Sequence, residues 1–308
     1  MEILSQGELN WVYIEAPTER EINFLAQNYH FHSLALDDCI SKVQLPKVDK
    51  YEDYLFIVLH FPAFSAEGRM FSSQLSIFLG KNYLVTISTS DLKPLSEVFQ
   101  KCKIDERARS EVLRSPGYLL YYIIDQLVDS LFPILDKIIS DLDDIEDKVF
   151  DEKVEAVREV TILRRRIARL RRVTYPLKRV IEELSREISH YIKDDLSIYF
   201  SDVEDHIDKV WATLDECKEI IEIYKDTDFM LSTEKTNKIL AVLTIFFTLS
   251  IPATVIAQIY GMNIPLPGGV ETGPWTFLGP YTTLIILLII SAIPALAMLW
   301  YFRRAGWL

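Results

Sequence analysis

Polar side chains recur at helical spacing along an otherwise apolar stretch near the C-terminus. Polar groups are costly in hydrocarbon, so a face that carries them turns toward protein or water. The spacing alone leaves two interpretations open, hydrogen bonds between packed helices or the wall of a water-filled pore. The members of this face are separated alternately by three and four residues: Asn237, Leu240, Thr244, Phe247, Ile251, Thr254, Gln258 and Gly261.

Two uncharged runs, residues 239–260 and 281–302, are long enough to cross a membrane. As helices, each would cover about 33 Å, against a hydrocarbon core of about 30 Å. The first run carries the polar face. The second is uniformly aliphatic in its middle, so we expect it to form an outer, lipid-facing helix.

Charges beside these runs predict the orientation of the chain. Lys235 and Lys238 precede the first run, Arg303 and Arg304 follow the second, and the loop 261–280 has no basic residue. By the positive-inside rule, both termini are expected in the cytoplasm and the loop outside. We therefore expect a multi-pass protein of the plasma (inner) membrane.

The composition excludes one large class of partner. The chain has 308 residues and a net charge of −12, which argues against a nucleic-acid binder held by phosphate contacts. An acidic surface would suit a protein that handles cations, but ordinary solvation explains it equally well. Cys39, Cys102 and Cys217 are odd in number and far apart, which indicates reduced thiols rather than disulfides or metal ligands. Residues 1–6 show no signal-peptide pattern.

Residues 1–115 predict a small cytoplasmic α/β domain with a partly antiparallel sheet. Thr18 and Glu21 form a capping-box pattern, which predicts that a helix begins at Glu19. Lys81–Asn82 predicts a hairpin turn. Runs rich in β-branched and aromatic residues predict strands at Trp11–Ile14, Tyr54–Leu59, Leu75–Leu79 and Tyr83–Ile87.

The following segment, Tyr118 to Tyr260, is predicted to be almost entirely helical. It has no glycine, and its prolines are Pro133, Pro176 and Pro252. Nothing in the sequence breaks a helix between the last two prolines, so we expect one helix from Asp202 to Tyr260, about 90 Å long. A helix so long and exposed needs partners, which predicts a homo-oligomer. Its cytoplasmic part shows the seam of a packed helix: Ile207, Val210, Leu214, Cys217, Ile221 and Tyr224.

Two charged segments lie in this helical region. Residues 140–155 are densely acidic and residues 164–172 densely basic. We expect solvated helix faces that pair across a helical hairpin. Binding of anionic lipid by the basic segment is a weaker alternative.

The end of the first uncharged run resembles the signature of CorA-type magnesium transporters and channels. Tyr260-Gly261-Met262-Asn263 stands between two C-terminal spans, as in that family. The resemblance covers essentially the whole chain, through further matching segments: Gln44–Val48, Tyr51–Phe56, Lys235–Asn237, Leu243–Thr244 and Ile251–Thr254.

The resemblance implies a funnel-shaped homopentamer, in which the first span lines a pore and the second forms an outer ring. Asn263 would form a ring of amide oxygens at the outer mouth, with Gly261 and Met262 shaping the turn behind it and Tyr260 supporting that turn. Pore-lining and gating positions would be Asn237, Leu240, Leu243, Thr244, Phe247, Ile251, Thr254 and Gln258. The implied segments are a cytoplasmic α/β domain 1–115, a helical stalk region 116–238, the pore-lining span 239–260, the outer loop 261–280, the outer span 281–302 and a basic cytoplasmic tail 303–308.

Such a mouth suits the chemistry of magnesium. Mg²⁺ gives up its waters reluctantly, so a fast pathway is better built to hold the hydrated ion. Neutral amide oxygens can accept hydrogen bonds from those waters without binding the metal tightly. The membrane potential supplies about 4.6 kcal/mol per 100 mV for an entering dication. The sequence has no phosphate-binding glycine loop, so ATP-driven pumping is not expected. Apolar rings could close the pathway by dewetting.

The resemblance also implies gating by intracellular Mg²⁺ bound between protomers. Asp226 falls at the position of one regulatory stalk aspartate, and Asp228 could assist it; a solvated acidic face explains both residues equally well. Two departures from the family concern the mouth. Glu271 is the only acidic residue of the loop, and Gln258 is larger than the small residue expected there.

Other functions remain open at this level. A Zn²⁺, Co²⁺ or Ni²⁺ transporter of the same fold is one alternative, although Met262 favours magnesium over zinc. Five histidines do not form a metal-ligand pattern. A non-conducting membrane-anchored sensor or scaffold is a second alternative. No catalytic constellation stands out, so an enzyme and an organic cofactor are not expected.

Overall fold

The computed structural model describes residues 1–308 except 42–43, 66–67, 91, 151–155, 193, 263–264, 270–271, 279–280, 305 and 307–308. Its contacts divide the chain into two units, Met1–Asp226 and Thr227–Leu308. One helix, α8 (Ser197–Tyr260), contributes residues to both units.

The first unit begins with a six-stranded sheet of order β1-β2-β6-β5-β4-β3. Among the strand pairs of the described residues, only β2–β6 is parallel, so the predicted partly antiparallel sheet is confirmed. All four predicted strands and the turn at Lys81–Asn82 are present. The strands are β1 (Glu2–Gln6), β2 (Leu9–Glu15), β3 (Lys47–Lys50), β4 (Tyr54–Phe64), β5 (Met70–Gly80) and β6 (Tyr83–Ser88).

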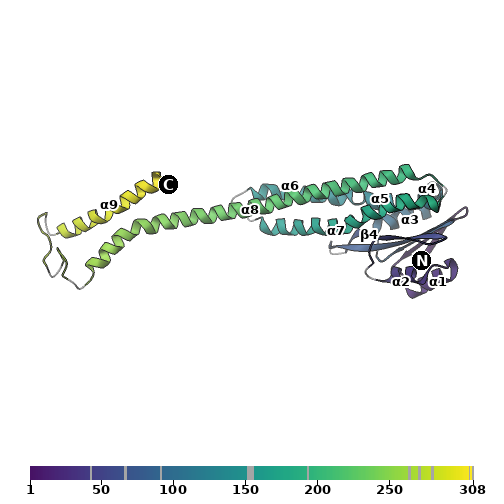
Figure 1. Cartoon of the computed structure of the whole chain (residues 1–308), viewed down its shortest axis with the longest axis horizontal. Coiled ribbons are helices and arrows are strands. Elements are labelled where there is room, and N and C mark those ends of the chain that lie inside the picture. The colour runs from purple at the N-terminus through teal and green to yellow at the C-terminus, as the bar shows by residue number, and fades with distance from the viewer. Residues whose placement is uncertain are drawn as a thin grey trace. The chain divides into compact units, whose positions relative to one another are not determined.

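Alternation along the strands sends buried side chains to both faces of the sheet. On one face, Val12 and Ile14 of β2 lie in a core shared with α1 (Glu19–Tyr29) and α2 (Ser33–Ile40). On the other face, Trp11 and Tyr13 join the main core of the first unit. Figure 1 shows α1 and α2 on one side of the sheet and the longer helices on the other. The predicted capping box of Thr18 and Glu21 begins α1.

The helices on the second face carry the predicted buried seam. Every seam residue from Ile207 to Tyr224 is at most 7% exposed. These residues pack in the same core as the helices that precede α8. The helices are α3 (Lys93–Ile104), α4 (Glu106–Val112), α5 (Pro116–Asp129), α6 (Phe132–Val149) and α7 (Val157–Glu187). The free cysteines Cys39, Cys102 and Cys217 are all buried.

Ion pairs join the charged segments of these helices, as predicted. Arg166 of α7 pairs with Asp141 of α6, and Arg171 pairs with Asp215 of α8. Most of these side chains are solvated, so each pair contributes at most about 1 kcal/mol to stability. The buried apolar core that α6, α7 and α8 share holds these helices together.

The predicted helix from Asp202 to Tyr260 lies within α8 and is confirmed, but the expectation that nothing breaks a helix between Pro176 and Pro252 is wrong. Pro176 lies inside α7 without ending it, whereas α7 ends at Glu187, a 3₁₀ turn (Ile188–His190) follows, and α8 begins at Ser197. One carboxylate oxygen of Asp195 accepts hydrogen bonds from the backbone N–H of Ser197 at 3.1 Å and from its hydroxyl at 2.6 Å. These bonds also lower the pKa of Asp195. A side chain that satisfies backbone donors in this way begins a helix without proline or glycine.

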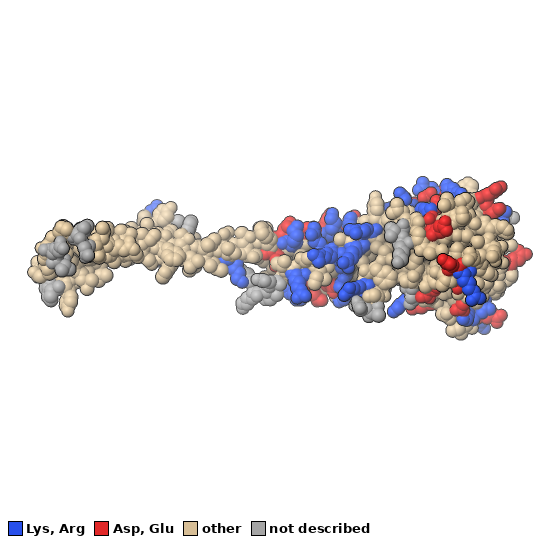
Figure 2. Space-filling model, turned by 90° about the horizontal axis from the view of Figure 1, so that it is seen from below, with Lys and Arg blue, Asp and Glu red and all other residues tan. Residues whose placement is uncertain are grey.

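The second unit contains the rest of α8 and the helix α9 (Thr282–Arg304). Figure 2 shows the outer surface of this part almost without Lys, Arg, Asp or Glu, in contrast to the charged helices of the first unit. Three stretches of the described residues are long and apolar enough to cross a membrane: Pro116–Val149, Ser197–Tyr260 and Thr282–Arg304. Within an apolar 18-residue segment of each stretch, 44% of the residues are buried for Pro116–Val149, against 6% for the other two. The helices α5 and α6 therefore belong to the core, and α8 and α9 contain the candidate spans.

Candidate functional site

The polar face of α8 is exposed along its whole length in the single chain. We call Asn237, Leu240, Thr244, Phe247, Ile251, Thr254 and Gln258 the polar stripe; all seven are exposed. The more enclosed side chains of the same span lie on a different face of the helix: Ala241, Ile245, Thr248, Pro252 and Ile256. The structure therefore brings the predicted stripe together as one open surface. Leu243, predicted to line the pathway as well, is 46% exposed beside it.

Threonine hydroxyl groups of this span donate hydrogen bonds to backbone carbonyls of the same helix. Thr254 donates to the carbonyl of Ser250 at 3.0 Å, and Thr248 donates to the carbonyl of Thr244 at 2.6 Å. The oxygen lone pairs remain available as acceptors. The side-chain amides of Asn237 and Gln258 form no hydrogen bond with any described residue. The stripe therefore presents neutral acceptors and amides that need partners outside the single chain.

The C-terminal end of α8 positions the signature. The N–H of Gly261 donates to the carbonyl of Ala257 at 3.0 Å, and that of Met262 donates to the carbonyl of Ile259 at 3.2 Å. A Cβ atom on Gly261 would lie 3.2 Å from the Ala257 carbonyl oxygen, so a larger residue would crowd this turn. Met262 is 56% exposed. Tyr260 donates its hydroxyl proton to the carbonyl of Pro267 at 3.2 Å and so joins the helix end to the loop.

The predicted site residue Asn263 lies outside the described residues, as does Glu271, the one acidic residue of the loop. The described part of the loop is held by hydrogen bonds to α9. Thr283 accepts from the backbone of Trp275, and Thr282 accepts from the backbone of Leu278, both at 3.0 Å. The loop is thus tied at both ends, to Tyr260 and to the first turn of α9.

The two predicted regulatory aspartates do not lie among other potential metal ligands of the described chain. Asp226 pairs with its neighbour Lys225 at 3.2 Å and its side chain is 70% exposed. Asp228 is half-buried. Neither belongs to a group of three metal-ligating side chains among the described residues. In the single chain these two carboxylates alone do not make a cation site.

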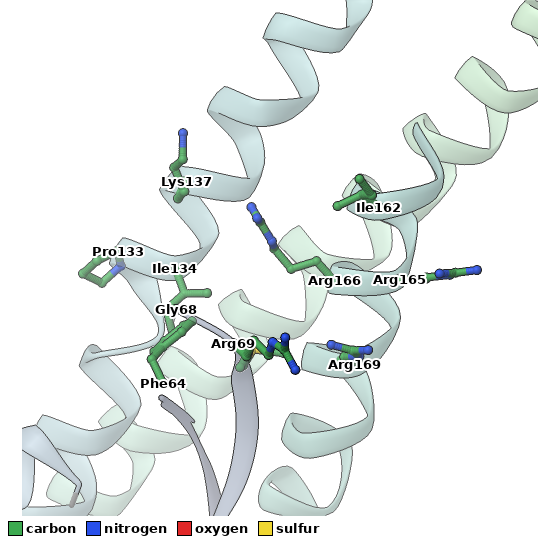
Figure 3. A pocket seen from close by; sticks show the side chains of 11 residues that line it. Phe64, Gly68, Arg69, Pro133, Ile134, Lys137, Ile162, Arg165, Arg166 and Arg169 are labelled. Carbon is green, nitrogen blue, oxygen red and sulfur yellow. The ribbon is translucent and has the colours of Figure 1, made fainter. Parts of the chain in front are cut away.

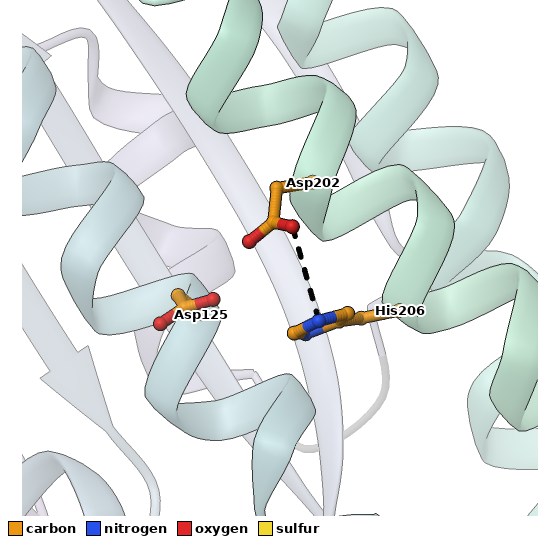
Figure 4. A group of neighbouring side chains, drawn as sticks. All are labelled: Asp125, Asp202 and His206. Atoms are coloured by element: carbon orange, nitrogen blue, oxygen red, sulfur yellow. Dashed lines mark ion pairs between the residues drawn. The ribbon is translucent and has the colours of Figure 1, made fainter.

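Asp125, Asp202 and His206 form a group that the sequence reasoning missed (Figure 4). One potential ligand atom from each lies within 4.8 Å of the others, and Asp129 adds an oxygen 2.9 Å from His206 Nδ1. That oxygen and Nδ1 are buried but not aligned as a hydrogen bond. Burial, followed by the charge of Asp129, raises the pKa of Asp125. A divalent cation would neutralise this crowded set of carboxylates.

The local sequence explains how this group forms. Asp125 and Asp129 are four residues apart on α5, and Asp202 and His206 are four apart on α8, so each pair lies on one helix face. The main core packs α5 against α8 and brings the two faces together. The two spacings of four residues can be read in the sequence. That α5 packs against α8 cannot, so the sequence alone did not predict this group.

Comparison with known proteins identifies the family. The family model described as CorA-like Mg²⁺ transporter protein matches residues 6–304. The chain belongs to this family. YfjQ of Bacillus subtilis is 29% identical to it, covering 100% of this chain and 93% of its own length. The cobalt/magnesium transport protein CorA of Thermotoga maritima is 31% identical, covering 91% of this chain and 78% of its own length.

The fold agrees with a solved member of the family. The CorA magnesium transporter of Methanocaldococcus jannaschii superposes with a TM-score of 0.80 at 21% identity, covering 100% of this chain and 94% of its own. The predicted family is therefore confirmed, as is the predicted α/β domain with a long helix and membrane-capable helices. Transport of Mg²⁺ is the function that the family description names.

Proposed function

We propose that the chain forms a homo-oligomeric channel, a pentamer by its resemblance, that conducts hydrated Mg²⁺ inward. In this proposal residues 239–260 line the pathway, 281–302 form an outer helix against lipid, and 1–115 and 116–238 form the cytoplasmic α/β domain and stalk. Transport follows the electrochemical gradient and involves no chemical step in the protein. A dication gains about 4.6 kcal/mol on entering at 100 mV.

One observation carries the proposal: the polar stripe of α8 is exposed in the single chain, and its amides lack partners among the described residues. Gln258 lies inside the uncharged span, where an unsatisfied amide facing lipid would cost several kcal/mol. Copies of α8 arranged around an axis would instead turn the stripe toward a shared aqueous pathway. The uncharged side chains along it would interact with the water shell of the ion rather than with the metal itself.

The roles proposed along the pathway follow the chemistry of each side chain. Asn263 supplies the amide ring at the outer mouth, with Gly261, Met262 and Tyr260 behind it. Thr254, Gln258, Thr244 and Asn237 accept or donate hydrogen bonds to hydrating waters. Leu240, Leu243, Phe247 and Ile251 narrow the pathway, and their apolar rings exclude water when they come together.

The proposed orientation places both termini in the cytoplasm. Arg303 and Arg304 lie in the last turn of α9, beside Trp300 and Tyr301. Basic residues favour the cytoplasmic side, and Trp and Tyr favour the membrane interface. The loop with the signature is then outside, where it meets entering ions.

We propose that intracellular cations regulate the channel through the group of Asp125, Asp202 and His206. The close ligand atoms and the raised pKa of Asp125 support this choice over Asp226 and Asp228, which in the single chain lack further ligands among the described residues. Asp226 and Asp228 remain candidates for a site shared between subunits. A bound cation would hold α5 and α8 together; its loss would leave their carboxylates in mutual repulsion.

Substitution of the signature tests the pathway. Proteoliposomes holding the protein and a Mg²⁺ indicator should take up Mg²⁺, and Asn263→Ala should abolish most of this uptake while leaving insertion and oligomeric state unchanged. Uptake that survives the substitution would remove Asn263 from the mechanism. The same assay with Co²⁺, Ni²⁺ and Zn²⁺ sets the ion preference. We expect Co²⁺ and Ni²⁺ to pass, because their hydrated ions resemble hydrated Mg²⁺.

A further inference from the structure

A cavity lined by cationic side chains lies between the ends of β4 and β5 and the helices α6 and α7 (Figure 3). Its volume is about 570 Å³, within the range of small-molecule sites. All of its described lining residues belong to the first unit. None of them belongs to the polar stripe or to the group of Asp125, Asp202 and His206.

The cavity has an excess of positive charge. Arg69, Lys137, Arg165, Arg166 and Arg169 are among its lining residues, and none of the described lining residues is acidic. In Figure 3 the guanidinium groups of Arg69 and Arg169 point toward one another, and Arg166 extends into the space between α6 and α7. Like charges converge here in a chain whose net charge is −12. The arrangement favours an anion in the cavity.

Nearby carboxylates compensate only part of this charge. Asp141 forms ion pairs with both Lys137, at 2.8 Å, and Arg166. Arg165 and Arg169 form no ion pair with any described residue, although Arg165 directs its head group away from the cavity in Figure 3.

Other arginines of the basic segment behave differently. Arg164 pairs with Glu222 and Arg171 pairs with Asp215, both on α8. Arg164 and Arg171 therefore join α7 to α8. Arg169 lines the cavity instead.

Apolar side chains form the remaining wall. Phe64 and Ile162 are 53% and 50% exposed, although large apolar side chains are usually covered. Pro133 and Ile134 of α6 lie beside them in the same cavity. A ligand that matches both walls has a flat apolar part and a compact, strongly negative part. Guanidinium groups bind phosphate with paired hydrogen bonds, which makes phosphate the best-matched anion.

We propose that this cavity binds a soluble nucleoside polyphosphate. Its phosphates lie among Arg69, Arg166 and Arg169, and its base lies against Phe64 and Ile162. The bound ligand bridges the β4–β5 hairpin, α6 and α7, so it stabilises the first unit in proportion to its occupancy. This binding does not depend on ion conduction.

Binding to the full-length protein in neutral detergent tests the proposal. The probe is ATP in buffer without divalent cations, followed by calorimetry and thermal unfolding. We expect saturable binding that Arg169→Ala weakens by about tenfold or more. Arg172→Ala is the matched control, because Arg172 is exposed on the same helix but does not line the cavity; its effect should stay within about twofold. Arg169→Lys keeps the charge but loses the paired hydrogen bonds, so its affinity should fall between those of the parent and Arg169→Ala.

Each other outcome would overturn the assignment. Equal weakening by Arg169→Ala and Arg172→Ala would show diffuse attraction to a basic surface. Binding of inorganic triphosphate as tight as that of ATP would remove the role of the apolar wall. Arg169-dependent binding of soluble short-chain phosphatidylglycerol, without ATP binding, would assign the cavity to lipid headgroups. Absence of binding by a well-folded parent would end the proposal, whatever the outcome of ion-uptake assays.

Discussion

The hydroxyl of Tyr260 and the carbonyl oxygen of Pro267 form a hydrogen bond of 3.2 Å between the last residue of α8 and the loop that follows it. The bond holds Pro267 of the loop close to the end of α8. Gly261 and Met262 lie in the chain between these two bonded residues. This relationship connects the helix that carries the polar stripe with the proposed ion-selective mouth.

Removing this hydroxyl should loosen the mouth without disturbing the fold. A hydrogen bond contributes about 1 kcal/mol net, so Tyr260→Phe should lower the population of this loop position by up to about fivefold. We expect Mg²⁺ uptake into proteoliposomes to fall by a similar factor. Tyr281→Phe is the control, because Tyr281 is 70% exposed and its hydroxyl bonds to no described residue. Equal uptake by both variants would contradict the role of the Tyr260 bond.

The polar stripe should tolerate loss of a hydroxyl less well than the neighbouring face of the same helix. Thr254 and Thr248 each donate to the carbonyl four residues before them, but only Thr254 lies on the stripe. Thr254→Val should reduce uptake severalfold, since it removes an acceptor for hydrating water. Thr248→Val has the same shape and removes the same kind of internal bond, and we expect near-parental uptake. If Thr248→Val lost more uptake than Thr254→Val, the ion pathway would lie along the face of Thr248 and not along the polar stripe.

Substitution of Asp125 should raise the thermal stability of the protein without a cation and reduce the stability that a bound cation adds. The pKa of Asp125 is raised in the fold, so the folded state is favoured when this carboxyl is protonated and loses that stability as pH rises through the raised pKa. Asp125→Asn should therefore unfold at a higher temperature than the parent at pH 7 in EDTA. The parent should gain more stability from millimolar Mg²⁺ or Co²⁺ than the variant does.

Asp205→Asn supplies the control for this measurement. Asp205 is exposed on α8, three residues from Asp202, and is not part of the ligand group. It should keep the parental response to cations and the parental melting temperature in EDTA. If Asp125→Asn kept the full cation response, the site would have to lie elsewhere, with Asp226 and Asp228 as the next candidates.

The seam of α8 offers a matched test of the packing. Ile221 is fully buried in the main core, whereas Ile223, two residues on, is 59% exposed. Ile221→Ala should lower the free energy of unfolding by about 2–4 kcal/mol, and Ile223→Ala by less than about 1 kcal/mol. Chemical denaturation of the detergent-solubilised protein, followed by circular dichroism, measures both. Similar losses would contradict the proposed orientation of the helix in the core.

Periodicity in the sequence predicted the elements that pack in layers. The central strands have long apolar runs, and the seam and polar stripe of α8 follow the helical repeat, so their faces could be read directly. The strands that sequence reasoning missed are the two edges of the sheet, β1 and β3. Lys47–Lys50 is short and mostly charged, as edge strands often are, and it is ordered by pairing with β4 rather than by its own pattern.

Features that depend on tertiary contacts could not be predicted in this way. The beginning of α8 follows from a side-chain bond of Asp195, in a stretch without proline or glycine. The cation group needs α5 beside α8, and Asp125 is far from Asp202 in the sequence. The cationic cavity needs the β4–β5 hairpin beside α7, so the basic segment alone predicted only a solvated or lipid-binding face.

Potential-driven uptake by the unmodified protein decides whether α8 lines an ion channel. Proteoliposomes loaded with a Mg²⁺ indicator, free of ATP, are given an inside-negative potential by a potassium gradient and valinomycin. We expect Mg²⁺ uptake that increases with the potential, at about 2.3 kcal/mol per charge per 100 mV of driving force. No uptake by correctly inserted, oligomeric protein, or uptake that requires ATP, would contradict a channel lined by the polar stripe of α8.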